Sequence, residues 1–265
     1  MAAPLTRSTA AKKRTEVQGH GFCWETDILT NVYGASAEEL DTIKYTSASD
    51  LPAKYNRLEK CKLSIKTTGS ANTVCMADCL RIYDKAVSGT PLHLVVIHYG
   101  QNDDTKTKKV NSIVEVDLTS STQLLFGSLT RDAIESLDQL VKSVPQKRRP
   151  TAEEHDLMYK LRAKLQEKSG AIYFNIKCDS SQSRLQCSFN RFQTFLKENP
   201  SRVIAQSTTN EFRGGAISAE ISSSRRVFKP KKEKEEAKAE PKAEPKAKKT
   251  KEPKAKEPKT AAKKK

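Results

Sequence analysis

Asp50, Ser64 and Lys66 are the residues whose types and spacing point most clearly to chemistry. In the segment KLSIKT, a strand would turn Ser64 and Lys66 to one face and the apolar Leu63 and Ile65 to the other. Asp50 stands 16 residues before Lys66 and closes another predicted strand. Carboxylates at adjacent strand ends can hold a divalent cation, and a nearby ammonium can orient water and offset charge that develops on phosphorus. The pattern therefore suggests metal-assisted cleavage of a phosphodiester.

A second carboxylate could join this site from a helix predicted over residues 22–33. Glu25 shares a helical stripe with Ile28, Leu29 and Val32 at i, i+3, i+4, i+7 spacing. This spacing places an acidic side chain on the face of the helix that packs on the core.

Each of these features also has an ordinary structural explanation. An Asp and a Lys separated by 16 residues occur by chance in many proteins. Glu25 could cap its helix or pair with Lys44, and Lys66 could protect a strand edge against aggregation. The functional interpretation is preferred because Glu25, Asp50 and Lys66 together have the order along the chain, the types of predicted element and the side-chain faces that a metal-phosphate site requires.

The elements that must position these residues alternate between strand and helix, which predicts the α/β class. SAEE and TAEE are capping boxes that begin helices at Ser36 and Thr151. LHLVVIHY is apolar almost throughout, as in a central strand covered on both faces. Strands are predicted over 43–50, 61–67, 92–99 and 112–118, and helices over 22–33, from 36, over 76–87, over 130–144 and from 151 to 170.

Beyond residue 170 the sequence becomes rich in predicted strands. AIYFNIK and RLQCSF flank a turn as a hairpin, RFQTFLKE forms a short helix, and RVIAQ and AISAEIS add strands. Residues 171–228 are therefore predicted to form a β-rich lobe, either a subdomain or an extension of the main sheet.

Several segments resemble the PD-(D/E)XK nuclease superfamily, and within it the type II restriction endonucleases of large DNA viruses of eukaryotes. The matching segments are WETDIL, SASDLP, LSIKTTGSANTVCMADCLRIYD and FNIKCDSSQSRLQCSF. The resemblance is loose and spans about residues 20–228. It implies a restriction-endonuclease-like mixed sheet flanked by helices, with Mg²⁺ as cofactor, Asp50 as metal ligand, Lys66 as catalytic lysine and Glu25 as the helical acidic residue.

Ser64 departs from the pattern of this family, which has Asp or Glu two residues before the lysine. A hydroxyl is a weak, neutral metal ligand, so the site lacks one carboxylate. Either Glu25 supplies the missing oxygen or catalysis is lost. Asp78, in the next predicted helix, is a further candidate ligand.

A lysine-rich tail follows the predicted lobe. Residues 229–265 hold 16 lysines against 7 glutamates and carry +9 of the net charge of +16. Ala is the only aliphatic residue type of this segment, so the tail cannot bury enough surface to offset chain entropy and is predicted to be disordered. The predicted organisation is a disordered basic arm over 1–19, a nuclease-like core over 20–170, the lobe over 171–228 and this tail.

Cysteine and histidine usage indicates no zinc site. No CxxC pair occurs among the six cysteines, and the four histidines lack ligand spacing. Reduced thiols in an intracellular protein are the preferred explanation. The sequence also contains no apolar run of signal-peptide or membrane-spanning type. The protein is therefore expected in the cytoplasm or nucleus of a host cell, or in a virion, and not to be secreted.

Double-stranded DNA is the expected partner, because the folded part and the tail are both basic and phosphate neutralisation favours binding. Forked donors that could read base edges are Arg184 and Gln186 on one strand face, Lys177 across the hairpin, and Arg225 and Arg226 beyond it. The tail should add affinity that is independent of sequence, or it could instead solubilise the protein or direct nuclear import.

The sequence is compatible with two functions. The first is a site-specific, magnesium-dependent endonuclease, which implies a homodimer for paired cuts and a possible companion DNA methyltransferase. The second is a DNA-binding or DNA-packaging protein on a degenerate nuclease scaffold. Ser64 favours the second function and Lys66 favours the first.

Overall fold

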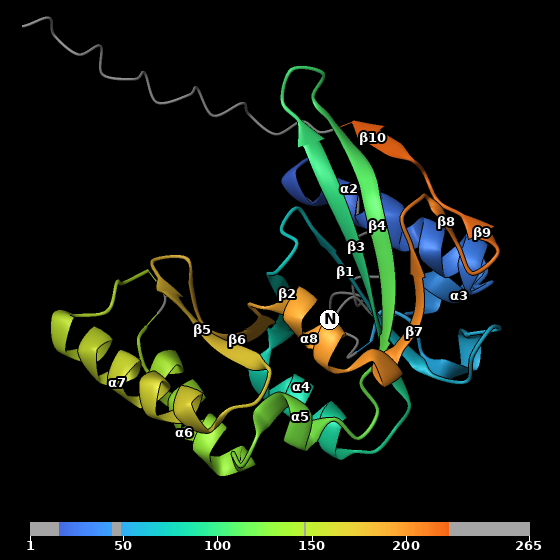
Figure 1. Ribbon diagram of the computed structural model, residues 1–265. Helices are drawn as coiled ribbons and strands as arrows, with labels where there is room; N and C mark the ends of the chain where they lie inside the picture. Colours follow the sequence, from blue (N-terminus) through green and yellow to red (C-terminus); the bar gives the residue numbers. More distant parts are fainter. Residues whose placement is uncertain (1–15, 44–48, 146, 223–265) are drawn as a thin grey trace, which may run out of the picture. The chain divides into compact units, whose positions relative to one another are not determined.

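A mixed sheet of five strands and a second sheet of three strands frame the chain (Figure 1). The computed structural model describes residues 16–43, 49–145 and 147–222, which belong to one unit, residues 1–226. Helices flank the sheets, so the predicted α/β class with a mixed sheet is confirmed.

The main sheet is built on the antiparallel hairpin of β3 (Leu92–Asn102) and β4 (Thr107–Asp117). β1 (Lys62–Thr68) pairs with β3 in parallel, because the chain returns between them through a crossover. On the other side, β7 (Val203–Ser207) and β10 (Glu220–Ser222) both pair with β4, at different positions along its length.

The second sheet consists of β2 (Val74–Asp78), β6 (Gln182–Phe189) and β5 (Ile172–Asp179), with β6 in the middle. All neighbours are antiparallel, and β5 and β6 form the predicted hairpin. A separate two-stranded ribbon joins β8 (Glu211–Phe212) to β9 (Gly215–Ala216).

β2 occupies a segment whose second half the sequence analysis assigned to a helix. Val74 and Met76 are buried whereas Cys75 between them is exposed, which is the alternation of a strand. The Asp78 carboxylate then accepts a hydrogen bond from the backbone N–H of Arg81 at 3.0 Å and caps the helix that follows. The prediction that this helix begins at Met76 is therefore wrong by three residues.

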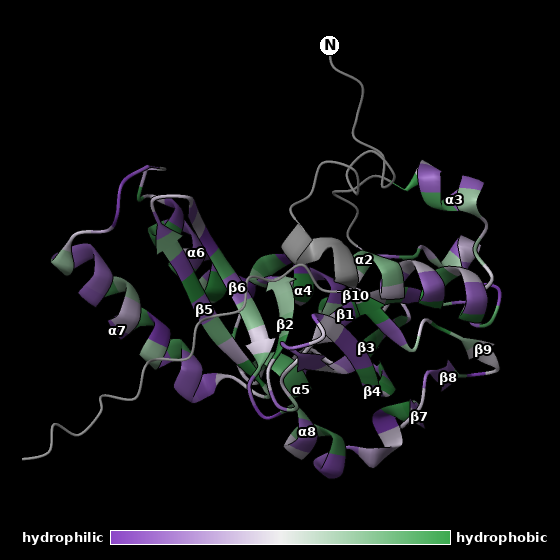
Figure 2. Ribbon diagram, turned by 90° about the horizontal axis from the view of Figure 1, so that it is seen from above, coloured by the Kyte–Doolittle hydropathy of each residue, from purple (hydrophilic) through white to green (hydrophobic). Residues whose placement is uncertain are grey.

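The helices that begin at Ala37, Arg131, Ala152 and Phe192 start within one residue of where the sequence places them, and both predicted capping boxes, at Ser36 and Thr151, are confirmed. Hydrophilic residues predominate along α7 (Figure 2). No helix among the described residues is long and apolar enough to cross a membrane. The helices are α2 (Glu16–Asp27), the π-helix η1 (Ile28–Val32), α3 (Ala37–Thr42), the 3₁₀ turn η2 (Ala53–Tyr55), α4 (Cys79–Val87), α5 (Thr122–Phe126), α6 (Arg131–Lys142), α7 (Ala152–Lys168), α8 (Phe192–Glu198) and the 3₁₀ turn η3 (Pro200–Arg202).

The main sheet separates two apolar cores because side chains alternate along its strands. On one face, Leu94 and Val96 of β3 pack with residues of α4 to α8 and of the second sheet. On the other face, Val95 and Ile97 pack with α2, η1 and α3. Each side chain of β1 therefore points either toward the core that α4 covers or toward the core that α2 covers.

Residues 171–222 do not form a lobe of their own. β5 and β6 pair with β2, whereas β7 and β10 extend the main sheet. The sequence was compatible either with a subdomain or with an extension of the main sheet. In the structure, β5 and β6 form a second sheet together with β2 from the predicted core, and β7 and β10 extend the main sheet. The predicted arm also differs, because α2 begins at Glu16. Residues 1–15, 44–48 and the tail over 229–265 lie outside the described residues.

A close backbone approach at Gly127 gives a test of the packing between α5 and α7. Gly127 has φ +60°, and a Cβ there would collide with the carbonyl oxygen of Lys168. Gly89 has a similar φ of +65°, but its nearest neighbour, the Ser120 hydroxyl, lies 3.9 Å from a Cβ. We expect Gly127→Ala to lower the free energy of unfolding by about 1–3 kcal/mol more than Gly89→Ala, because both substitutions strain φ but only one adds a clash.

Urea denaturation followed by fluorescence of the single tryptophan, Trp24, measures both variants. Equal losses in Gly127→Ala and Gly89→Ala would show that the approach to Lys168 is not tightly packed.

Candidate functional site

Asp50 lies beside β1 through backbone pairing. The N–H of Asp50 donates to the carbonyl of Leu63 at 2.8 Å, and Leu51 forms an antiparallel bridge with the same residue. The segment before Pro52 thus reaches the edge of β1 that β3 leaves open. Of the strand predicted over 43–50, residues 44–48 lie outside the described residues.

The side chains of Asp50, Ser64 and Lys66 meet at this edge. Asp50 Oδ2 accepts hydrogen bonds from Ile65 N at 2.7 Å, from Lys66 Nζ at 3.3 Å and from Ser64 Oγ at 3.4 Å. Lys66 Nζ also donates to the carbonyl oxygen of Ile65 at 2.7 Å. The Asp50 and Lys66 side chains are 28% and 24% exposed, so solvent or a ligand can reach them.

The register of β1 decides which core this group faces. Ser64 and Lys66 stand opposite Leu94 and Val96, so they point to the face that α4 covers. Glu25 is half-buried on α2, and α2 packs against the opposite face through neighbours such as Trp24. The structure thus brings Asp50, Ser64 and Lys66 together and places Glu25 on a helix of the other layer.

Two oxygens of this site could hold a hard cation. Asp50 Oδ2 and the carbonyl oxygen of Ile65 both bind the Lys66 ammonium, so they converge on one positive charge. Mg²⁺ fits such a donor set, because it keeps several waters and uses one or two carboxylates together with substrate phosphates. Asp78 caps α4, and no group of three or more His, Cys, Asp or Glu residues suited to a metal occurs among the described residues.

Lys85 of α4 belongs to the electrostatic environment of this site, which the sequence analysis missed. Burial, and then the positive charges of Lys66, Arg81 and Lys62, lower the pKa of Lys85 to about 8, although the negative charge of Asp50 opposes the shift. The i, i+4 spacing of Arg81 and Lys85 on one helix face was the available sequence signal.

A second charged group, centred on Glu115, lies on the opposite face of the main sheet, where Glu115 stands opposite Val95. The fully buried Glu115 carboxylate lies 2.6 Å from His93 Nδ1 and accepts a hydrogen bond from Arg213 Nη1 at 2.7 Å. Arg213 also donates to Glu59 at 2.6 Å. Two acids and two bases therefore balance in charge when His93 is protonated.

The pKa values of His93 and Glu115 are shifted in the directions that keep both side chains charged. Although burial opposes the charge of His93, hydrogen bonding to Cys61 and Glu115 raises the pKa of His93 to about 10. Burial likewise opposes the charge of Glu115, but hydrogen bonds from His93 and Arg213 hold the pKa of this carboxyl below its usual range. Burial, followed by the negative charge of Glu115, raises the pKa of the Tyr33 hydroxyl far above its usual range.

His93→Gln should change how stability depends on pH. The pKa of His93 lies near 10 in the fold against an ordinary 6.5, so the native state binds more protons between these values. The contribution of His93 to stability is then fully present below about pH 6.5 and is lost as the pH rises through about 10. We expect the fall in unfolding free energy between pH 6.5 and 10 to be smaller in the variant than in the parent protein.

Urea titrations at a series of pH values measure this difference. His155→Gln, on the exposed face of α7, is the control and should retain the parent profile. Identical profiles for the parent protein and His93→Gln would contradict the assignment.

The residues predicted to read DNA bases lie mostly on the β5–β6 hairpin. Lys177 and Arg184 are exposed and stand directly opposite each other in register. Gln186 shares the face of Arg184 and is half-buried. Arg225 and Arg226 lie outside the described residues. Three of the five predicted residues thus share the outer face of the second sheet.

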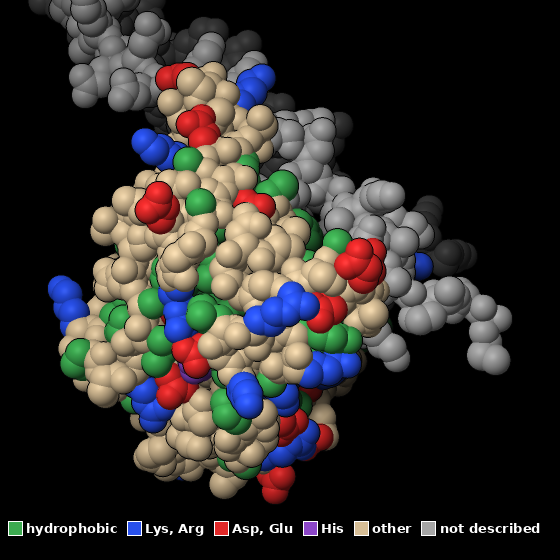
Figure 3. Space-filling model, turned by 90° about the vertical axis from the view of Figure 1, so that its right-hand side faces the viewer, with side chains coloured by type: hydrophobic (Ala, Val, Ile, Leu, Met, Phe, Trp, Pro, Cys, Tyr) green, Lys and Arg blue, Asp and Glu red, His purple; other side chains and the backbone are tan. Residues whose placement is uncertain are grey.

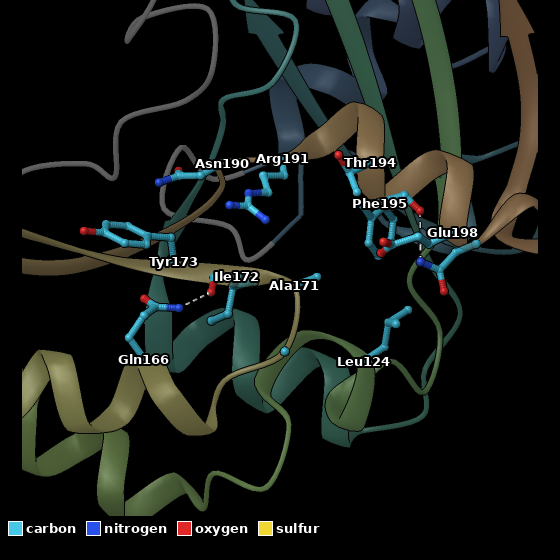
Figure 4. Close-up of a pocket in the computed structure, with 12 residues that line it drawn as sticks. Leu124, Gln166, Ala171, Ile172, Tyr173, Asn190, Arg191, Thr194, Phe195 and Glu198 are labelled. Carbon is cyan, nitrogen blue, oxygen red and sulfur yellow. Dashed lines mark hydrogen bonds between the residues drawn. The ribbon is translucent and has the colours of Figure 1, made fainter.

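A pocket of about 510 Å³ opens at the end of this hairpin, where α7, β5 and α8 meet (Figure 4). The Arg191 guanidinium points toward β5, and Gln166 is held by a hydrogen bond to the carbonyl of Ile172 at 2.8 Å (Figure 4). Tyr173 lines the pocket and shares a face of β5 with Lys177, so the pocket and the basic hairpin belong to one surface.

The face that carries β8 and β9 has a different charge pattern. Basic and acidic side chains are interspersed there (Figure 3). The three predicted base-reading residues of the described chain belong instead to the hairpin of the second sheet.

Comparisons of this chain with protein-family models, with curated proteins and with solved structures gave no match.

Proposed function

We propose that this protein is a metal-dependent endonuclease that cleaves double-stranded DNA at specific sites. The observation that carries the proposal is the contact of the Asp50 carboxylate with the Lys66 ammonium and the Ser64 hydroxyl on one face of β1. A crossover through β2 and α4 links β1, which carries Ser64 and Lys66, to the parallel strand β3. The resemblance to PD-(D/E)XK nucleases implies a helix directly after the catalytic strand, whereas here β2 lies between β1 and α4.

Each residue of the site has a role in the proposed reaction. Asp50 and the carbonyl of Ile65 would hold Mg²⁺, which supplies Lewis-acid activation of a phosphoryl oxygen or a bound water. Lys66 orients the attacking water and offsets negative charge on the phosphate. Ser64 holds Asp50 in place by hydrogen bonding, since a neutral hydroxyl contributes little as a metal ligand.

The partners follow from the same proposal. The exposed Lys177 and Arg184 supply contacts to DNA from the second sheet. Paired cuts on two strands imply a homodimer, and a companion DNA methyltransferase would protect the DNA of the source. Such an enzyme would act in the cytoplasm or nucleus of a host cell, or in a virion.

Cleavage of unmodified plasmid and phage DNA by the purified full chain tests the proposal. We expect discrete fragments with Mg²⁺ and none with EDTA. Lys66→Ala should lower the rate by a factor of at least about 100, the range of a general acid–base or charge-stabilising group.

Lys109→Ala is the matched control, because Lys109 is an exposed lysine of the same sheet, on β4. Fragments that persist in EDTA, or that Lys66→Ala produces at the parent rate, would exclude this catalytic site.

A second candidate function is DNA binding without cleavage. Two observations favour it: Ser64 stands where the resembled family has a carboxylate, and no three-residue metal group occurs in the described part of the chain. DNA binding that is unaffected by EDTA and by Lys66→Ala, without any cuts, would support this alternative.

Ser64→Asp distinguishes a weakened metal site from a lost one. An added carboxylate beside Asp50 repels it without metal and supplies a second charged ligand with metal. We expect the variant to be less stable than the parent in EDTA and to gain at least about 1 kcal/mol more than the parent from 5 mM Mg²⁺, which corresponds to a roughly fivefold tighter site.

Thermal unfolding with and without Mg²⁺ measures this gain. Ser64→Asn, which adds a side chain of the same size without charge, is the control. The same response to Mg²⁺ in both variants would show that the edge of β1 does not bind metal.

A further inference from the structure

Lys85 is a half-buried lysine that one carboxylate and three other cations influence. Within the part of the chain that the structure describes, its ammonium forms no ion pair, and Asp50, the nearby acid, is paired with Lys66. Lys66, Arg81 and Lys62, which are all positive, also act on Lys85. Asp84, its neighbour on α4, is taken by Arg131 at 2.9 Å.

Two elements bring these cations together. Lys62 and Lys66 lie four residues apart on one face of β1, and Arg81 and Lys85 lie four residues apart on one face of α4. α4 packs on the side of the main sheet to which Lys66 points. Lys66 contacts the Asp50 carboxylate at 3.3 Å, and the other three cations lie on the same strand and on the helix that covers its face.

The charge of this group, which we call the Lys85 cluster (Lys62, Lys66, Arg81 and Lys85), exceeds that of Asp50 by three. The three lysines of the cluster are half-buried, and partial burial of positive charge with too little negative charge nearby is unfavourable, so this group suits an anionic ligand. One phosphodiester carries a single negative charge. An excess of three therefore fits several adjacent phosphates better than one.

We propose that Lys85, together with Lys62 and Arg81, binds the phosphate backbone of nucleic acid beside the Asp50–Lys66 site and positions the phosphates that flank the reacting one. The identity of the ligand rests on the proposed function. The cluster itself rests on the placement of β1 and α4.

Chemical labelling of lysine amines, mapped residue by residue by mass spectrometry, tests this proposal on the full chain in metal-free buffer. The probes are a 12-bp DNA duplex and a peptide-nucleic-acid duplex of the same sequence, which lacks phosphates. We expect saturating DNA to slow labelling of Lys85 and Lys62 at least about threefold, because phosphate contacts exclude the reagent, and the uncharged duplex to leave it unchanged.

Lys164 on α7 is the internal control, since it is an exposed lysine on a helix that packs against α6 and β5. A residue-resolved measurement separates the cluster from the lysines of the tail. Unchanged labelling of Lys85 at saturating DNA, or equal protection by the uncharged duplex, would overturn the proposal.

Two variants link the cluster to affinity. Lys85→Gln should weaken binding of the duplex by about tenfold, the loss expected for one charged hydrogen bond, and Lys85→Arg should retain it. Equal binding by Lys85→Gln and the parent chain, with unfolding free energies also equal, would reject the assignment.

The outcomes also separate this inference from the proposed function. Protection of Lys85 without any metal-dependent cleavage would retain the phosphate site and reject the nuclease. Cleavage that depends on Lys66 while Lys85 stays unprotected would reject the phosphate site and retain the nuclease.

Discussion

The parallel pairing of β1 with β3 is the constraint on which both the core and the candidate site depend. With Ser64 opposite Leu94 and Ile65 opposite Val95, the apolar and polar residues of β1 separate onto two faces. A shift of one residue would bury Lys66 in the core beneath α2 and turn Ile65 toward the site. The backbone N–H of Ile65, which binds Asp50 at 2.7 Å, would also move away. One register thus fixes the packing and the polar contacts together.

The two faces of the main sheet handle charge in opposite ways. Around Glu115, acids and bases are paired at 2.6–2.7 Å, balance one another and join β3, β4 and the β8–β9 ribbon. Because a buried charge is costly unless it is paired, this group fixes its members in position. Around Asp50 the positive charges outnumber the carboxylate, and the side chains remain partly open to solvent. The charges around Glu115 are buried and paired, as in an ionic group that stabilises the fold. The positive charges around Asp50 are in excess and partly exposed, so that group is suited to an anionic ligand.

The sequence predicts local structure well where one signal dominates. The capping boxes at Ser36 and Thr151, the apolar run of β3 and the β5–β6 hairpin all depend on neighbours in the chain, and all are confirmed. β2 was missed in part because Met76 satisfies both a helical stripe and a strand alternation. The local sequence pattern could not predict that residues 171–222 divide between two sheets, because this division depends on pairing with strands far away in the chain.

For the site, residue spacing identified Asp50, Ser64 and Lys66, which do meet. It could not assign Glu25 to a layer, because helical periodicity gives the buried face of a helix but not which side of a sheet receives that face. It also missed Lys85 and Glu115, whose environments arise from residues far apart in the chain.

The way β4 acquires its outer partners has a consequence for synthesis on the ribosome. β4 ends at Asp117, but the first strand that covers its outer edge, β7, begins only at Val203. At elongation rates of roughly 5–20 residues per second, the nascent chain carries a formed β3–β4 hairpin with an open edge for on the order of ten seconds. During that interval its free N–H and C=O groups can accept a strand from another chain. The last twenty residues of the described fold therefore protect the nascent sheet from intermolecular pairing as well as complete it.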